Sequence, residues 1–258
     1  DQDNGIIYED VPKEKDEIVK NYFLTLGEKV VAGLEQYGFR RCKGGVMANN
    51  ELWCRSFRSW RQTINEWIND LQPQNVRLMT IFLDFRYLYG KKSLYDLLRN
   101  FVIRNFRNSF VVLNFLVQDN LGKKVPISLF RHVQTERTKE HRHELNLKSS
   151  ACVHVVDCTR VFALREGLLV TNTFERLEEI GKRGILKEKD IEYITLAYET
   201  LMMLRIREAM AKMRKGLQPD NYINPRLLTN REYSLLREAL IMVSRLQGIT
   251  ESHFKIIR

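Results

Sequence analysis

The sequence has little of what marks several common classes of protein. Its 258 residues include only four cysteines and five prolines, and no apolar run approaches the roughly 20 residues of a membrane helix. The cysteines form no C-x-x-C pair and match no zinc-site spacing, so we expect reduced thiols in a cytoplasmic protein. No signal peptide is visible, and G-x-S-x-G, P-loop and dinucleotide-binding motifs are all missing. These absences leave nucleophilic catalysis by Ser or Cys, P-loop nucleotide binding and dinucleotide binding without support.

Acidic residues are fewer than basic ones. The chain has 42 Lys and Arg against 32 Asp and Glu, a formal net charge of +10, which favours anionic partners such as nucleotides, nucleic acid or an acidic protein. The basic residues are dispersed, with no block of five or six, as they would be on solvated helix faces. RNA binding is therefore the weakest of the functions that we consider.

The first half of the chain mixes strand and helix patterns. We expect strands at 4–8 and 77–90, a helix at 16–37, a loop at 39–50, and a second helix that carries the aromatic residues from Trp53 to Trp67. The aromatic spacing in this second helix is typical of core packing.

The second half is predicted to be helical. Two short extended pieces, 125–130 and 142–148, are joined by a charged loop, and two capping-box patterns begin at Asn172 and Thr229. The expected helical segments are 93–118, 150–167, 172–183, 187–215 and 229–247. We expect these helices to form an antiparallel bundle. The apolar residues expected in its core include Met202, Met203, Leu204, Ile206 and Met210.

Three carboxylates are candidates for chemistry. Asp1 and Asp3 are one residue apart before an apolar run, so on a strand both would point the same way; a polar, frayed end is the alternative. Asp84 lies within the predicted strand 77–90, where an unpaired charge would be costly, and it could be exposed or paired with Arg86. Carboxylates on neighbouring strands would suit a hard divalent cation.

The wider sequence contains a series of longer motifs. In the first half they are "DQDNGII" at 1–7, "GGVMANNELW" at 44–53 and "IFLDFR" at 81–86. In the second half they are "VPISLF", "DCTRVFALREG", "TNTFERL", "AYETLMMLRIRE" and "NYINP". In these motifs, and in their order through nearly the whole chain, the sequence resembles a bacterial family of nucleotidyltransferases related to the enzyme that uridylylates the nitrogen-regulatory PII protein.

The resemblance implies an α+β fold: a polymerase-β-like nucleotidyltransferase domain at 1–106, incomplete at its N-terminus, and a helical substrate-binding domain at 107–258. It implies transfer of a nucleoside monophosphate from a nucleoside triphosphate to a protein or small-molecule acceptor. Asp1, Asp3 and Asp84 would hold Mg²⁺ or Mn²⁺. Family members often follow cyclic-nucleotide-binding or CBS regulatory domains, so those domains are expected partners.

One family motif is missing. The family has a Gly-Ser turn, with a nearby arginine, just upstream of its Asp-x-Asp strand, and this turn cradles the triphosphate. The sequence starts after that position. We therefore expect the chain as given to lack a competent nucleotide site, and a non-catalytic nucleotide- or protein-binding signal-transduction module is the alternative function.

Further residues are candidates for binding the nucleotide or acceptor, and each has a structural alternative. Gly44 and Gly45 could form a plain turn, and Asn49 and Asn50 could cap the following helix. Arg160 could form an i,i+3 pair with Asp157. The other basic candidates are Arg86, Lys148 and Arg165, and a metal pair of His141 and His143 is a remote alternative because it lacks a third ligand.

Overall fold

The structure is a computed structural model that describes residues 1–255. Its contacts divide the chain into an amino-terminal unit, residues 1–105, and a carboxy-terminal unit, residues 106–258. The predicted α+β class is confirmed: strands are few and short, and helices make up most of both units. None of the helices between residues 1 and 255 has the length and apolar character that crossing a bilayer requires.

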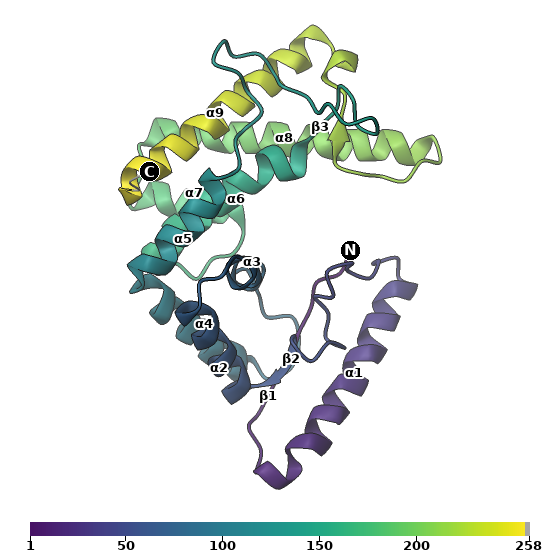
Figure 1. Ribbon diagram of the computed structural model, residues 1–258, viewed down its shortest axis with the longest axis vertical. Coiled ribbons are helices and arrows are strands. Elements are labelled where there is room, and N and C mark those ends of the chain that lie inside the picture. The colour runs from purple at the N-terminus through teal and green to yellow at the C-terminus, as the bar shows by residue number, and fades with distance from the viewer. Residues whose placement is uncertain (256–258) are drawn as a thin grey trace. The chain divides into compact units, whose positions relative to one another are not determined.

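The amino-terminal unit is built on a two-stranded parallel sheet. Strand β1 (Ile6–Tyr8) pairs with β2 (Cys54–Ser56), in a register that places Ile6 opposite Cys54. Helix α1 (Asp16–Gln36) packs on one side of this pair and α2 (Phe57–Asn69) on the other (Figure 1). A single 3₁₀ turn at Lys13–Lys15 leads into α1, which spans the region where the sequence predicted a helix.

Aromatic side chains form the core of this unit. Trp53, Trp60 and Trp67 are buried, and the Trp60 ring stacks on Phe82 with the ring centroids 4.8 Å apart. The Trp60 indole also donates a hydrogen bond to the Ile6 carbonyl (3.1 Å), which joins α2 to β1. The core interpretation of the aromatic spacing is confirmed, but Trp53 lies before β2, and α2 begins only at Phe57.

The predicted strand at 77–90 is wrong. Helix α3 (Pro73–Phe82) occupies its first half, and a turn follows. Pro73 stands at the first helical turn, where its fixed backbone is favourable, and Val76, Met79 and Phe82 recur every three residues on the buried side. A short apolar run fits both a buried strand and a buried helix, so its pattern alone could not decide.

Helix α4 (Lys92–Arg107) runs across the boundary between the units: its residues up to 105 belong to the amino-terminal unit, and its last two belong to the carboxy-terminal unit. The carboxy-terminal unit begins with α5 (Phe110–Leu121) and continues through a charged loop to β3 (Leu145–Asn146), which pairs antiparallel with β4 (Tyr222–Ile223). One π-helical turn at Lys148–Cys152 leads into α6 (Val153–Arg165). The remaining helices are α7 (Thr173–Lys182), α8 (Glu188–Arg214) and α9 (Asn230–Phe254), with a 3₁₀ turn at Pro225–Leu227.

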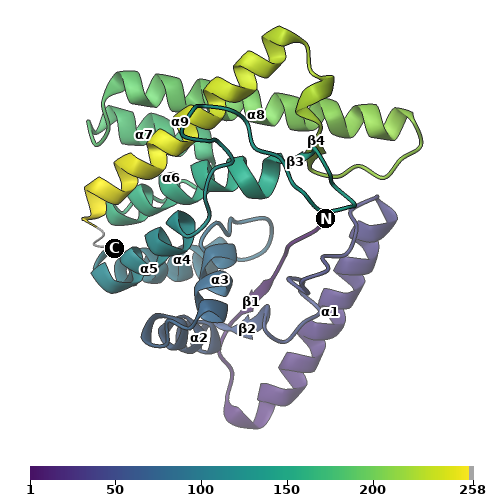
Figure 2. The same ribbon diagram turned by 45° about the horizontal axis from the view of Figure 1, so that its top comes forward.

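Helix α6 is the centre of this bundle. It packs against α5, α7 and α9, while α9 crosses α8 (Figures 1 and 2). The predicted helix starts are confirmed: Asn172 caps α7, and Thr229 and Glu232 form a complete capping box on α9. The carboxy-terminal unit is therefore a helical bundle, as predicted.

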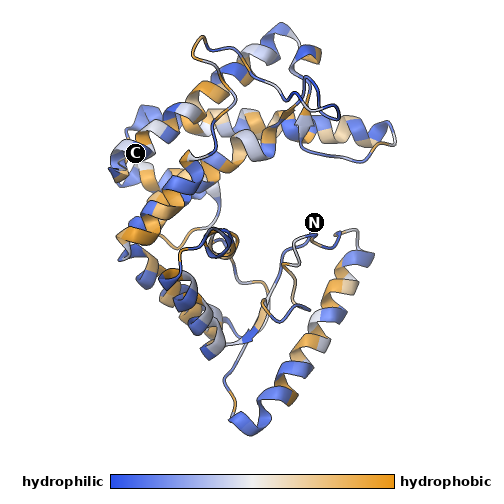
Figure 3. Cartoon of the chain, in the orientation of Figure 1, coloured by the Kyte–Doolittle hydropathy of each residue, from blue (hydrophilic) through white to orange (hydrophobic). Residues whose placement is uncertain are grey.

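One prediction about the bundle core is wrong. Leu204 on α8 is fully buried, but Met203, Ile206 and Met210 are about half exposed, and Met202 is partly exposed. Apolar residues follow one another around much of α8, and only one side of the helix contacts α7 and α9. Figure 3 shows apolar residues interspersed with hydrophilic ones along this helix.

Candidate functional site

The segment before β1 is held in place by a glutamine. Gln2 is buried, and its side-chain amide donates to the carbonyls of Val31 (3.1 Å) and Phe39 (3.1 Å). Its backbone N–H donates to the Arg40 carbonyl (2.9 Å). Because extended side chains alternate, Asp1 and Asp3 face the other way, and both are exposed. The two carboxylates therefore share one side of an anchored segment, rather than a frayed end.

Asn4 continues this anchoring on the buried side. Its amide nitrogen donates to Gln2 Oε1 (2.9 Å), and its Oδ1 accepts from the Ala48 N–H (2.8 Å). On the other side of Ala48, helix α1 comes so close that a Cβ on Gly27 would lie 2.2 Å from the Ala48 carbonyl oxygen. A glycine is required there, so the loop at 42–50 is held between α1 and the strand.

The glycines and asparagines of that loop stabilise it from within. Gly45 has a φ of +69°, and its carbonyl accepts a hydrogen bond from the Asn50 side chain (2.9 Å). Asn49 donates to Glu28 (2.6 Å), and its Oδ1 is buried without a hydrogen-bond partner in residues 1–255. Neither asparagine caps α2, because that position is taken by Ser56, whose hydroxyl accepts from the Ser59 N–H. Gly44 has no such conformational requirement.

Asp84 lies in the turn after α3, on no strand. It belongs to the same unit as Asp1 and Asp3, but nowhere in residues 1–255 are three or more His, Cys, Asp or Glu side chains gathered as a metal site requires. The neighbouring Leu83 carbonyl accepts from the buried Arg99 guanidinium (2.6 Å), which ties this turn to α4. Arg86, two residues on, is exposed.

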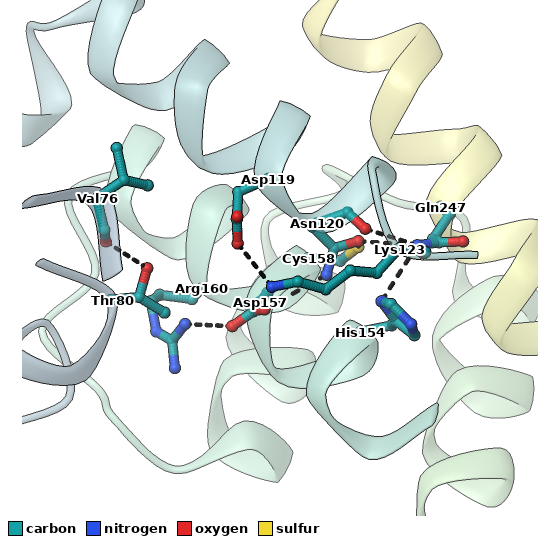
Figure 4. Close-up of polar contacts among 10 residues, drawn as sticks. All are labelled: Val76, Thr80, Asp119, Asn120, Lys123, His154, Asp157, Cys158, Arg160 and Gln247. Carbon is teal, nitrogen blue, oxygen red and sulfur yellow. Dashed lines mark hydrogen bonds and ion pairs between the residues drawn. The ribbon is translucent and has the colours of Figure 1, made fainter. Parts of the chain in front are cut away.

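The carboxy-terminal unit contains a buried ion pair. Asp157 and Arg160 stand three residues apart on α6, with Asp157 Oδ1 2.5 Å from Arg160 Nη1, and both side chains are almost fully buried (Figure 4). The i,i+3 alternative that the sequence left open is thus present. A charge pair removed from water is costly unless further groups bond to it, and Asn120 on α5 contributes a weak hydrogen bond to Asp157 Oδ2 (3.4 Å).

A neutral cluster continues from this pair toward α9. The Gln247 amide nitrogen lies 3.1 Å from the Asn120 carbonyl and 3.2 Å from Nδ1 of His154, and Cys158 reaches Asn120 Oδ1 (3.5 Å). Figure 4 shows these side chains converging from α5, α6 and α9. We assign the His154 proton to Nε2, since Nδ1 accepts from the amide. Nε2 is buried and has no hydrogen-bond partner within residues 1–255.

Burial sets the protonation of the cluster. Desolvation lowers the pKa of His154, so the neutral ring is favoured, although the Asp157 charge partly opposes this shift. Desolvation also raises the pKa of the Cys158 thiol to about 12, which keeps it protonated and unreactive. The cluster is therefore suited to holding three helices together rather than to catalysis.

The other predicted binding residues lie near the ends of α6 and in the charged loop. Lys148 is exposed at the π-helical turn, and the Arg165 guanidinium lies over the Phe254 ring (5.2 Å). His141 stacks on Tyr222 and bonds to Glu144 (2.8 Å), so this histidine is committed to local structure.

Sequence reasoning missed the anchoring roles of Gln2 and Asn4 and the cluster around His154. The sequence did contain a signal for the anchoring roles, because Gln2 and Asn4 alternate with the two aspartates. A signal for the cluster was also present, since polar residues interrupt the otherwise apolar α6 at His154, Asp157 and Arg160. Several of their hydrogen-bond partners are far along the chain, such as Val31, 29 residues from Gln2, and Gln247, 93 residues from His154, and no local pattern reveals these.

Comparison with known proteins identifies both units. Residues 1–74 match a family described as "Putative nucleotidyltransferase DUF294". Residues 110–254 match one described as "Putative nucleotidyltransferase substrate binding domain". A search of curated proteins and a search of solved structures each found no match. The chain belongs to this nucleotidyltransferase family, which confirms the resemblance seen in the sequence.

Proposed function

We propose that this chain belongs to a metal-dependent nucleotidyltransferase, which moves a nucleoside monophosphate from a nucleoside triphosphate to a hydroxyl of a protein or small-molecule acceptor and releases pyrophosphate. The family membership supports the general reaction class. The single observation that carries the proposal is the orientation of Asp1 and Asp3, which share the exposed side of a segment anchored through the buried Gln2.

The donor atoms of this pair fit a hard divalent cation. Mg²⁺ and Mn²⁺ prefer carboxylate oxygens, and Asp1 and Asp3 present two carboxylates on the same side. When bound, the cation would neutralise charge on the triphosphate and make the acceptor hydroxyl more acidic. Within residues 1–255 Asp84 does not join them in a three-ligand site, and it is proposed to take the proton from that hydroxyl.

The other residues of the chain would bind and orient the substrates. Gln2 and Asn4 keep the two aspartates pointing outward by bonding to backbone on the buried side. Arg86 is proposed to bind phosphate oxygens, and the loop residues Gly44, Gly45 and Asn49 the nucleotide. The exposed Lys148 is proposed to bind an anionic acceptor, whereas Arg160 is buried in its pair with Asp157 and is not available for this role.

Label transfer in the natural full-length protein tests the reaction. The protein is incubated with Mg²⁺, each α-labelled nucleoside triphosphate in turn, and cell extract as a source of acceptor. We expect label on an acceptor, and we expect Asp3→Ala and Asp84→Ala each to reduce the transfer rate at least about a hundredfold.

Glu14→Ala is the matched control, because it also removes one exposed carboxylate from the amino-terminal unit, and it should transfer label at the wild-type rate. Asp3→Ala must keep the wild-type unfolding midpoint for its result to count. The absence of transfer by the wild type, or equal transfer by wild type and Asp3→Ala, contradicts the proposal.

A second candidate function is a signal-transduction module that binds a nucleotide or a protein without transferring a group. The position of Asp84, in a turn after α3 and not on a strand beside β1, favours this candidate. Calorimetry with each triphosphate and Mg²⁺ separates the two functions. Metal-dependent binding without turnover supports the module, and measurable turnover rejects it.

A further inference from the structure

Helix α8 has an exposed apolar side. Five residues on it recur at intervals of seven, three, four and three, which places them on one face of a helix. They are Leu196, Met203, Ile206, Met210 and Met213, and we call them the α8 stripe. Each is between 48% and 62% exposed, although α7 and α9 cover the opposite side of the helix. A row of this length is more than the single exposed apolar residues that are normal on a surface.

The distribution of charge along α8 favours an antiparallel over a parallel pairing of two copies of this helix. Its first half, residues 188–201, has four acidic residues and one basic residue, a net charge of −3. Its second half, residues 202–214, has four basic residues and one acidic residue, a net charge of +3, and of these Arg207 and Lys212 pair with Glu232 and Asp220 within the chain. Two copies of this helix placed antiparallel would bring the acidic half of each against the basic half of the other, whereas a parallel pair would place like charges together.

We propose that the α8 stripe is the interface between two copies of this chain, which pair antiparallel about a twofold axis near Ile206. Such an interface is isologous, because one surface meets the same surface of the second copy. With the axis between residues 206 and 207, Met203 lies opposite Met210 of the second copy. Methionine side chains are flexible and adapt to one another at such contacts.

A charged residue sets the register. Glu199 occupies the place in the stripe between Leu196 and Met203 where an apolar residue would otherwise recur. About the same axis it faces Arg214 of the second copy. Neither Glu199 nor Arg214 makes an ion pair within the part of the chain that the structure describes, so both charges are available to a partner. The twofold symmetry forms this pair twice.

A hollow of about 360 Å³ lies beside the centre of the stripe. It is lined by Met202, Ile206 and Ala209 on α8 and by the loop residues Pro219 and Asp220, among others. At the axis it gives a concave surface that side chains of the second copy can enter. The loop is tied to α8 by hydrogen bonds from Lys212 to Asp220 (2.5 Å) and from Arg205 to Asn221 (2.6 Å).

Sedimentation of the full chain between roughly 1 and 100 µM, a range typical of weak to moderate association, tests the proposal. We expect the wild-type mass to rise with concentration toward twice the 30.6 kDa of one chain. Met203→Glu with Met210→Glu should remain monomeric throughout, since each copy would place two charges in the interface. Leu227→Glu is the matched control: Leu227 is 82% exposed in the same unit but outside the stripe, and this variant should dimerise like the wild type.

Charge exchange tests the antiparallel arrangement. We expect Glu199→Arg and Arg214→Glu each to weaken dimerisation about tenfold or more, because each substitution breaks two symmetry-related pairs. The double variant restores both pairs in reversed order and should return to within about threefold of wild type. Circular dichroism confirms that every variant keeps its helix content. A monomeric wild type, a dimer that survives both glutamates, or a double variant that does not recover each overturns the proposal.

Discussion

The two units use buried polar side chains in different ways. In the amino-terminal unit, Gln2 and Asn4 bond to backbone groups, and the aspartates between and beside them face outward as a result. In the carboxy-terminal unit, the buried polar groups around His154 and Asp157 bond mainly to one another and join α5, α6 and α9. In the first unit the polar groups bonded to backbone fix the side on which the aspartates lie, whereas in the second unit the polar groups bonded to one another join helices.

Trp60→Ala is expected to cause the largest loss in this comparison. It removes a fully buried indole that stacks on Phe82 and bonds to Ile6, so the amino-terminal unit should lose about 3–5 kcal/mol of stability. All three tryptophans belong to this unit, and the fluorescence of Trp53 and Trp67 reports its urea unfolding. Trp60→Phe keeps an aromatic ring and should lose less; equal losses would contradict the packing argument.

Asp157→Ala tests the carboxy-terminal unit in the same way. The substitution removes the carboxylate that lies 2.5 Å from the buried Arg160 guanidinium. We expect the free energy of unfolding to fall by about 3 kcal/mol, measured as faster hydrogen exchange of the α6 amides. Asp119→Ala breaks an exposed pair between α5 and Lys123, which lies just after the end of that helix, and should cost less than about 0.5 kcal/mol. The comparison fails if the buried and the exposed substitution have the same effect.

Gln2→Ala separates anchoring from chemistry. The carbonyls of Val31 and Phe39 lose their donor, so we expect a loss of about 1–3 kcal/mol, measured by tryptophan fluorescence in urea. Asp3→Ala, one residue away but exposed, should change stability by less than about 0.5 kcal/mol. A large destabilisation by Asp3→Ala would mean that this carboxylate is structural.

The smallest effect that we expect is that of His154→Gln on stability, and this effect depends on pH. Burial lowers the pKa of His154 below the 6.5 of an exposed ring, so the unfolded chain binds a proton first as pH falls. The contribution of neutral His154 to stability is therefore present above pH 6.5 and is lost as pH falls from there through the folded-state pKa, by at most about 1.4 kcal/mol per pH unit.

Helix unfolding followed by circular dichroism between pH 7 and 5 measures this dependence. His154→Gln should have a flatter profile than the wild type, and the exposed His132→Gln should match the wild type. Identical profiles for wild type and His154→Gln would show that His154 does not carry the pH dependence.

The positions of the long helices could be predicted from the sequence because their signals are local. Apolar residues recur at helical spacing in α1, α7 and α9, and the cap at Thr229 needs only the glutamate three residues later. The shared direction of Asp1 and Asp3 follows from alternation as soon as the segment is extended. The family could also be identified, because its motifs follow one another in order along the chain.

Tertiary contacts decided what local signals could not. The apolar run before Asp84 suits a strand or a helix, and burial of Val76, Met79 and Phe82 against the aromatic core selected the helix α3. Which side of α8 is buried depends on the positions of α7 and α9, so the exposure of the methionines could not be predicted from their spacing. The anchoring of Gln2 depends on carbonyls 29 and 37 residues away. Such contacts exist only once the chain has folded, since a side chain's partner is set by proximity in space and not by position in the sequence.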